Sequence, residues 1–285
     1  MIEKGVLYLV ATPIGNLEDI TYRAVRTLKE ADIIAAEDTR QTLRLLNAYK
    51  ISRPVTSYYH YNRAEKGEYL VKNLLEGKNV ALVSDAGTPG ISDPGEDLVK
   101  LAAAAGIRIS IIPGPAAVIA GLVMSGLPSG RFVFEGFLPV NSRGRKERLA
   151  VLKNETRTMV FYEAPHKLLN TLKDLAEYFG SRSIAIAREI TKIHEEVIRS
   201  TLTEAVEKYT LTTPRGEFVL IVEGACADEL KEADQKKWRN VGIKDHMEMY
   251  ISEGMDRKAA MKKVAEDRGV SRRDIYAAVI RKTEL

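Results

Sequence analysis

The chain has 285 residues, of which 45% are hydrophobic and 29% are charged, a composition typical of a globular protein rather than a disordered one. This length allows two domains of ordinary size, and no run approaches the roughly 18 apolar residues of a membrane span. The formal charge is +4, and the 14 basic and 10 acidic residues from Lys231 to Leu285 account for all of it. The basic excess therefore lies in the tail, where it either guides a polyanion or forms a solvated helical face.

The cysteine and histidine content argues against a disulfide-stabilised or metal-binding protein. The single cysteine, Cys226, excludes an internal disulfide, and the four histidines are scattered without ligand spacing. The first residues run directly into a strand, so no signal peptide is expected. We therefore expect a cytoplasmic protein with no metal site and no membrane association.

Residues 1–114 alternate short apolar runs with amphipathic segments. Strands are expected at 6–11, 31–36, 54–59, 80–83 and 107–112. Helices are expected after Thr21, which is placed to cap the first of them, and at 41–49, 64–77 and 98–105. Strands that alternate with helices at this spacing predict a parallel α/β sheet in an N-terminal domain.

Residues 115–225 form a second predicted α/β domain, with the Pro113-Gly114-Pro115 turn as its boundary. Helices are expected at 116–125, 145–153 and 167–178, and strands at 131–137, 158–163, 183–188, 194–201 and 217–223. No helix separates the strands between 183 and 201, which indicates a hairpin and mixed pairing.

The tail is predicted to be a linker at 225–234 followed by a helical extension at 235–285. Helices are expected at 236–252, 257–267 and 272–282. Asp256 is placed to cap the second of them, Gly269 to end it, and Ser271 with Asp274 to form a capping box for the third. Two short helices across a tight turn resemble a helix-turn-helix, and a helical cap that supports a dimer or the body is an equal alternative.

The stretch Ser84–Gly95 is rich in glycine and proline and directly follows a buried strand. The backbone must turn sharply there, at the position where open α/β sheets bind ligands. An ordinary strand-to-helix turn is the alternative, since such turns are also rich in glycine and proline. Unusual turns also follow other strands, at 12–17, 37–40, 113–117, 162–167 and 188–189. Their distribution over both halves indicates a ligand cleft between the domains. The glycine motifs of dinucleotide sites, phosphate loops and hydrolase elbows are absent from the sequence.

Several motifs together resemble the tetrapyrrole methylase family. They are Thr21-Tyr22-Arg23-Ala24, the Ser84–Gly95 loop and Pro113-Gly114-Pro115-Ala116-Ala117. The resemblance implies two α/β domains with S-adenosylmethionine between them, and a homodimer. Five segments are closer to an RNA-modifying branch of that family: 11–17, 36–40, 84–89, 162–167 and 187–189. That branch methylates the ribose 2′-oxygen of a decoding-site cytidine in 16S rRNA of the small ribosomal subunit.

The resemblance also implies which residues bind the cofactor. They are Asp85, Ala86, Gly87, Thr88, Pro89, Pro113, Gly114, Pro115, Ala116, Ala117, Ser125, Tyr162 and Arg188. Asp85 is expected to bond the ribose or the ammonium group, with an Asx-turn inside its own loop as the alternative. Arg188 also has a structural alternative, an ion pair with the adjacent Glu189.

A ribose hydroxyl is a poor nucleophile at neutral pH, so methyl transfer gains from a positioned base. Glu37, Asp38, Glu163 and Lys167 are the candidates, and the sequence does not rank them. The candidates for RNA contact, which could equally be solvated surface, are Arg23, Arg40, Arg143, Arg145, Lys146, Arg148, Arg272 and Arg273.

Two rival functions follow from the same residues. One is a precorrin-type C-methyltransferase acting on a tetrapyrrole, and the other is a non-enzymatic RNA-binding factor. The first loop, Thr12–Asn16, has less glycine than the loops of other tetrapyrrole methylases. We therefore expect the RNA-modifying branch.

Overall fold

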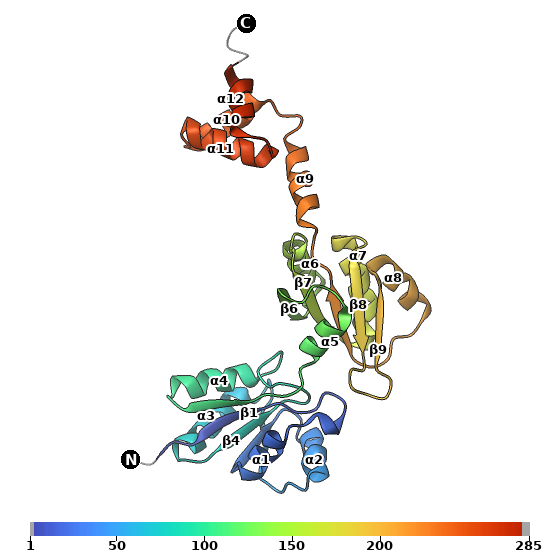
Figure 1. The fold of residues 1–285 in the computed structure, drawn as a ribbon. Helices are drawn as coiled ribbons and strands as arrows, with labels where there is room; N and C mark the ends of the chain where they lie inside the picture. The colour runs from blue at the N-terminus through green and yellow to red at the C-terminus, as the bar shows by residue number, and fades with distance from the viewer. Residues whose placement is uncertain (1–2, 281–285) are drawn as a thin grey trace. The chain divides into compact units, whose positions relative to one another are not determined.

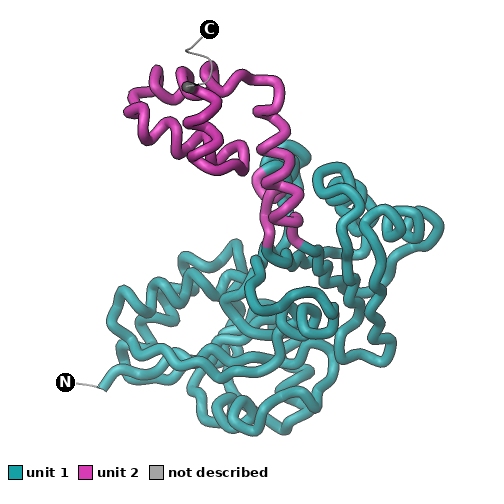
Figure 2. The backbone as a smooth tube through the Cα atoms, turned by 45° about the horizontal axis from the view of Figure 1, so that its top comes forward, with its two compact units in different colours: residues 1–150, 157–223 teal, residues 151–156, 224–285 magenta. Residues whose placement is uncertain are grey.

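The computed structural model describes residues 3–280, and the chain divides into two compact units. The first unit comprises residues 1–150 and 157–223, and the second comprises 151–156 and 224–285 (Figure 2). Both sheets belong to the first unit, and four helices make up most of the second (Figure 1). No helix within the described residues has the length and apolar character needed to cross a membrane.

The first sheet is fully parallel and has the strand order β3-β2-β4-β1-β5. Its strands are β1 (Val6–Val10), β2 (Ile33–Ala36), β3 (Val55–Ser57), β4 (Val80–Val83) and β5 (Arg108–Ile112). The connecting helices are η1 (Leu17–Asp19), α1 (Tyr22–Glu30), α2 (Thr39–Ala48), α3 (Arg63–Leu75) and α4 (Gly95–Ala104). Every residue of β2 and β4 is buried, as continuous apolar runs predict for strands covered on both faces. The predicted parallel α/β sheet is confirmed.

Helices cover both faces of this sheet. On one face Leu70 of α3 and Leu98 of α4 pack with Leu82 of β4, and all three are buried. On the other face Leu28 of α1 and Leu46 of α2 belong to a second buried cluster. The carboxyl ends of the parallel strands therefore share one edge, from which the loops after β1, β2, β4 and β5 emerge.

The second sheet is mixed, with the strand order β6-β7-β10-β8-β9. Its strands are β6 (Phe132–Phe137), β7 (Thr158–Glu163), β8 (Ser183–Arg188), β9 (Glu196–Thr201) and β10 (Phe218–Val222). The predicted hairpin of β8 and β9 is confirmed. Because β10 is antiparallel to both β7 and β8, its first residues lie at the edge where β7 and β8 end.

Helices also surround the second sheet. They are α5 (Ala117–Ser125), α6 (Ser142–Leu152), η2 (Pro165–Lys167), α7 (Leu168–Phe179) and α8 (Leu202–Leu211). Val118 and Leu122 of α5 pack in one cluster with Val219 and Ile221 of β10. A Cβ on Gly121 would lie 3.1 Å from Val219 Cγ1, so the glycine permits the close approach of this helix to the sheet. Helices α7 and α8 lie together on the opposite face (Figure 1).

The second unit contains α9 (Ala227–Lys237), α10 (Ile243–Ser252), α11 (Arg257–Arg268) and α12 (Arg272–Ile280). Its small core consists of Met247, Val264, Ala265, Ile275 and Val279. The predicted end signals are confirmed. Asp256 accepts a hydrogen bond from Ala259 N, Gly269 is left-handed with φ +62°, and Asp274 and Ser271 bond each other's backbone N–H.

One prediction for the tail is wrong, because the predicted helix 236–252 is interrupted between Trp238 and Gly242. The stretch 225–234, predicted as a linker, is largely helical, since α9 begins at Ala227. Helix α9 buries no residue, so its sequence lacks the apolar periodicity from which an amphipathic helix is predicted. Acidic residues in its first turn and lysines in its last favour it through the helix dipole instead. The last predicted helix extends to 282, so its final residues lie outside the described range.

Candidate active site

The strand-end edges of both sheets border one cavity of about 430 Å³ in the first unit. Loops of the first sheet, the connection before α5, and ends of β6, β7, β8 and β10 line it. The lining residues are Ile14, Glu37, Ser84–Thr88, Ile91–Asp93, Ala116, Ala117, Phe137, Tyr162–Pro165, Ile190 and Glu217–Val219. The predicted ligand site at the strand ends thus has a physical cavity, which we call the first cavity.

The loop after β4 is shaped by its own hydrogen bonds. The carboxylate of Asp93 accepts from the backbone N–H of Gly90 at 2.8 Å and of Gly95 at 2.7 Å. Gly87 and Gly90 have φ of +84° and +89°, a conformation that other residues rarely adopt. Gly87 also pairs with Thr12 through two backbone hydrogen bonds of 2.9 and 3.0 Å, which join the loops after β1 and β4.

Asp85 ties two loops together. Its Oδ1 accepts from Asp38 N at 2.8 Å, linking the loop after β4 to the one after β2. The Asx-turn considered for Asp85 belongs instead to Asp93. Burial raises the pKa of Asp85, an effect that the Asp38 N–H partly offsets. Asp85 lines the first cavity.

The four base candidates differ in their surroundings. Burial raises the pKa of Glu37, and the nearby carboxylates of Asp85 and Asp93 raise it further. Hydrogen bonds from Arg40 lower the pKa of Asp38 to about 2. Glu163 is buried, and its two oxygens accept from Ala164 N at 2.8 Å and Thr171 Oγ1 at 2.6 Å. Glu37 and Glu163 line the first cavity, whereas Asp38 and Lys167 are not among its lining residues.

One wall of the first cavity is apolar. It includes Ala116, Ala117, Phe137, Ile190 and Val219, and sequence reasoning missed the last three. Tyr162 was expected there. Its ring packs edge-on against Phe137, its hydroxyl accepts from Val118 N at 3.1 Å, and burial raises its pKa. Phe137, Ile190 and Val219 carry no motif, because an apolar strand residue has the same signature in a core and in a ligand pocket.

The remaining predicted cofactor residues are not among the residues that line the cavity. Pro115 O accepts from Thr88 Oγ1 at 3.3 Å, and a Cβ on Gly114 would lie 2.9 Å from Ala11 Cβ. The Pro-Gly-Pro turn therefore braces the loop that holds Gly87. Pro89 also belongs to that loop, outside the lining. Ser125 donates to Leu122 O at 2.6 Å, and Arg188 Nε donates to Arg215 O at 2.8 Å.

A second cavity of about 310 Å³ adjoins the first. It is more polar, and its lining residues are Thr12–Gly15, Leu17, Gln41, Thr42, Arg44, Leu45, Ser84–Ala86, Lys192 and Glu217. Five residues line both cavities: Ile14, Ser84, Asp85, Ala86 and Glu217. We call these five the shared wall.

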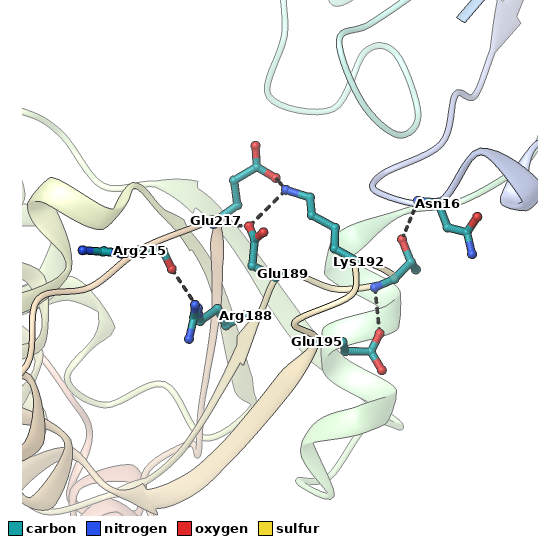
Figure 3. Close-up of polar contacts among 8 residues, drawn as sticks. Asn16, Arg188, Glu189, Lys192, Glu195, Arg215 and Glu217 are labelled. Carbon is teal, nitrogen blue, oxygen red and sulfur yellow. Dashed lines mark hydrogen bonds and ion pairs between the residues drawn. The ribbon is translucent and has the colours of Figure 1, made fainter. Parts of the chain in front are cut away.

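A network of charged residues stands at the shared wall (Figure 3). Lys192 Nζ lies 3.0 Å from Glu189 Oε1 and 3.0 Å from Glu217 Oε2. Glu189 Oε1 also accepts from Glu217 N at 3.0 Å. Glu189 is therefore paired with Lys192, and Arg188 is paired with Glu196 at 3.4 Å. These two ion pairs take the place of the structural pair considered between Arg188 and Glu189.

The turn after β8 carries this network and contacts the first loop of the chain. Glu189 and Thr191 have φ of +51° and +65°, which side chains of these types rarely adopt. Thr191 Oγ1 accepts from Asn16 N at 3.1 Å, and its own N–H donates to Glu195 Oε2 at 2.7 Å. These bonds hold the strained turn in place.

Most of the predicted RNA-binding cations already have partners. Arg143, Arg145 and Arg148 form ion pairs with Glu147, Asp174 and Glu135 at 2.8, 2.5 and 2.6 Å. Arg40 pairs with Asp38 at 2.8 Å, and Arg23 donates to Ile111 O at 3.3 Å. Lys146, Arg272 and Arg273 are exposed, the last two at the start of α12 in the second unit. These cations thus lie on four helices, α1, α2, α6 and α12.

Comparison with known proteins defines the class. The family of Tetrapyrrole (Corrin/Porphyrin) Methylases matches residues 6–206, more than half of the chain. The chain therefore belongs to the tetrapyrrole methylase family, as its motifs predicted. The fold agrees: the methyltransferase CobJ shares it with a TM-score of 0.59, at 22% identity over 78% of this chain and 95% of that one. A uroporphyrin-III C-methyltransferase from Thermus thermophilus, complexed with S-adenosyl homocysteine, gives 0.55 at 20% identity over 77% and 97%.

Curated relatives narrow the assignment to one branch. Proteins named "Ribosomal RNA small subunit methyltransferase I" from Halalkalibacterium halodurans and Bacillus subtilis are 50% and 46% identical to this chain. These alignments cover 96% and 97% of this chain, and 94% of each relative. The relative from Thermotoga maritima is 47% identical over 77% of this chain and 99% of its own length. The protein is accordingly an S-adenosylmethionine-dependent methyltransferase of this branch.

Proposed function

We propose that the protein transfers a methyl group from S-adenosylmethionine to the ribose 2′-hydroxyl of a decoding-site cytidine in 16S rRNA of the small ribosomal subunit. The observation that carries the proposal is a donor-sized cavity at the joined strand edges of a chain about half identical to a ribosomal RNA methyltransferase. A precorrin substrate is disfavoured by the names of these relatives. A non-enzymatic role is disfavoured by the intact cavity.

The residues of the first cavity fit this donor. An adenine ring needs an apolar slot, which Ala117, Phe137, Tyr162 and Val219 offer. The cationic ammonium and sulfonium groups and the ribose hydroxyls need acceptors. Asp85 and Glu37 supply carboxylates in the same cavity. The turn at Gly87 lets the backbone approach the ligand closely.

When bound, the donor supplies an electrophilic methyl carbon on a sulfonium sulfur. The task of the protein is then to align an acceptor oxygen with that carbon and to take up the hydroxyl proton. Glu163 has both oxygens engaged and Asp38 is bound to Arg40, so neither has a free oxygen suited to a base. Glu37 lines the first cavity only, which suits contact with the donor.

The cellular setting is part of the proposal. An enzyme for the small ribosomal subunit works in the cytoplasm, as a homodimer according to the family resemblance. Exposed apolar side chains on β5 and α5, Ile111, Ile119 and Val123, support an apolar contact between two copies. Light scattering on purified protein is expected to give twice the 31.7 kDa chain mass, and a value at the chain mass would contradict the dimer.

The function is tested by incubating the protein with labelled S-adenosylmethionine and either small ribosomal subunits or precorrins. We expect label in 16S rRNA, with sequencing-based mapping placing it on the 2′-oxygen of a single cytidine. Label in the precorrin, or on a base carbon or nitrogen of the RNA, would contradict the proposal. Calorimetry with the donor alone separates an inactive preparation from a non-enzymatic RNA-binding protein, which would show no donor binding at millimolar concentration.

A further inference from the structure

The second cavity adjoins the first cavity, in which we propose that the donor binds, without being part of it. Most of the residues that line it alone come from the loop after β1 and from α2, among them Pro13, Gly15, Gln41, Thr42 and Arg44, and Lys192 comes from the turn after β8. They present an amide, a hydroxyl and a guanidinium, the groups with which proteins contact nucleotides. Methyl transfer needs donor and acceptor in line across a short gap. Because five residues line both cavities, a donor in the first and an acceptor in the second would lie next to each other.

Arg44 is an available cation in this cavity. It is exposed on α2, and it makes no hydrogen bond or ion pair with any residue between 3 and 280. Arg40, one helical turn earlier on α2, is by contrast bound to Asp38 at 2.8 Å. A free guanidinium beside an amide and a hydroxyl suits a phosphate group, which the nucleotide chain of RNA supplies on each side of a ribose.

Glu217 is the more available of the two carboxylates on the shared wall. The other, Asp85, accepts a backbone hydrogen bond from Asp38. The side chain of Glu217 is 77% exposed, and its Oε2 is held by Lys192 at 3.0 Å, which leaves Oε1 without a hydrogen bond to any residue between 3 and 280 (Figure 3). Lys192 is itself fixed by Glu189. Burial alone lowers the pKa of Lys192, but hydrogen bonds to the two glutamates outweigh it and raise that pKa, so the lysine stays charged.

We propose that the second cavity is the acceptor site, in which Arg44 contacts a phosphate of the RNA and Glu217, positioned by Lys192, accepts the proton of the ribose 2′-hydroxyl. The inference rests on the proposed function. Sequence reasoning named neither residue. Glu217 follows a loop without a motif, and Arg44 is one of several arginines on an amphipathic helix.

The step balances without another reactant. The 2′-oxygen forms a bond to the methyl carbon while the carbon–sulfur bond breaks, and the electron pair of that bond stays on sulfur as a neutral thioether. The 2′ proton passes to the carboxylate of Glu217, which becomes a neutral acid and later releases the proton to water. Lys192 keeps its proton throughout and acts only by holding Glu217, so it is a positioning residue.

The test separates binding from chemistry. With small subunits as substrate and saturating donor, Arg44→Ala is expected to raise KM about tenfold with kcat unchanged, the loss of one charge-assisted contact. Arg44→Lys is expected to recover most of the effect, and the slope of RNA affinity against salt should fall by about one in Arg44→Ala. Arg53→Ala is the matched control, an exposed arginine of the same unit that lines neither cavity.

Glu217→Gln is expected to lower kcat about 100-fold at an unchanged KM, and to remove the rise of kcat with pH on the acid side. Lys192→Met is expected to lower kcat less than Glu217→Gln and to keep that rise. Donor affinity, measured by calorimetry, should change less than threefold in the variants of Arg44 and Lys192, which line the second cavity only.

The outcomes distinguish the two proposals. A wild-type protein that leaves 16S rRNA unmethylated overturns the proposed function and, with it, the acceptor site. A wild-type protein that methylates the RNA, with Arg44→Ala equal to Arg53→Ala and Glu217→Gln fully active, overturns the acceptor site alone. Circular dichroism of each variant detects any loss of folding. Arg44→Ala removes no contact among the described residues that folding would need.

Discussion

The two units of this protein use their polar residues in opposite ways. In the first unit, carboxylates gather at the strand ends and face cavities, and the pKa values of Glu37 and Asp85 are raised there. In the second unit, the conspicuous polar group, His246, is fully buried and stacked on Trp238 at 3.6 Å. Polar groups that face a cavity are available to a ligand, whereas His246 serves the packing of its own unit.

The comparisons do not cover the whole chain equally. The Thermotoga maritima protein matches 77% of this chain along 99% of its own length, so a protein of the same name lacks a counterpart to the remaining part. The family match ends at residue 206, before β10 and α9. We infer that donor binding depends on the first unit alone, and that the helical unit has an accessory role.

The largest expected effect is a loss of donor affinity when a carboxylate of the first cavity is removed. Asp85→Ala removes a carboxylate from the cavity and the hydrogen bond to Asp38 N, and should weaken S-adenosylmethionine binding about 100-fold by calorimetry. Removal of residues 231–285 should change the same affinity less than threefold. Equal losses in the two variants would contradict the division of labour between the units.

A smaller effect concerns the stability of the first unit. Thr171→Val removes the hydroxyl that donates to the buried carboxylate of Glu163 at 2.6 Å, and should lower the free energy of unfolding by about 2 kcal/mol in urea titrations. Thr203→Val, which removes an exposed hydroxyl 3.2 Å from Ser181 Oγ, is the control and should cost less than about 0.5 kcal/mol. Similar costs for both would show that the Glu163 contact is not stabilising.

The smallest effect is a pH dependence confined to the second unit. Burial lowers the pKa of His246 below 6.5, and the charge of Arg268 adds to this, against an opposing effect of Asp267. Arg268 Nε donates to Nδ1 at 3.2 Å, a bond that requires a neutral ring. The stability contribution is therefore complete above pH 6.5 and is lost as the pH falls through the lower folded pKa, because the unfolded state takes up the proton first.

Trp238 is the one tryptophan of the chain and stacks on His246, so its fluorescence reports on the unfolding of the second unit. Urea titrations followed by its fluorescence should show a lower midpoint at pH 5.5 than at pH 8. His246→Phe keeps the stacked ring and should remove the difference. A midpoint that is independent of pH in the wild type would contradict the buried neutral histidine.

Much of the fold could be predicted because local and tertiary preferences agree. Continuous apolar runs gave β2 and β4, and the Thr21 and Asp256 caps lie where predicted. Helix α9 escaped because no buried face gives it a period, and α8 was not anticipated although it starts with a capping box at Thr201.

The site was predictable where backbone geometry demands special residues. Gly87 and the Ser84–Thr88 segment fall at the cavity for that reason. Phe137 and Glu217 line one cavity, and Lys192 reaches Glu217, only when β6, β7, β10 and β8 assemble into one sheet. A contact between distant strands leaves no local signal. The sequence also could not show which carboxylates are already bound, which separates Glu37 from Asp38 and Glu163.

The account depends on two adjoining cavities with the donor in the first. A crystal structure of the protein with S-adenosylhomocysteine tests this most directly. We expect the adenine against Ala117 and Tyr162, the amino-acid end near Asp85, and the sulfur at the shared wall. Density for the ligand in the second cavity, or away from the strand-end edge altogether, would contradict the account.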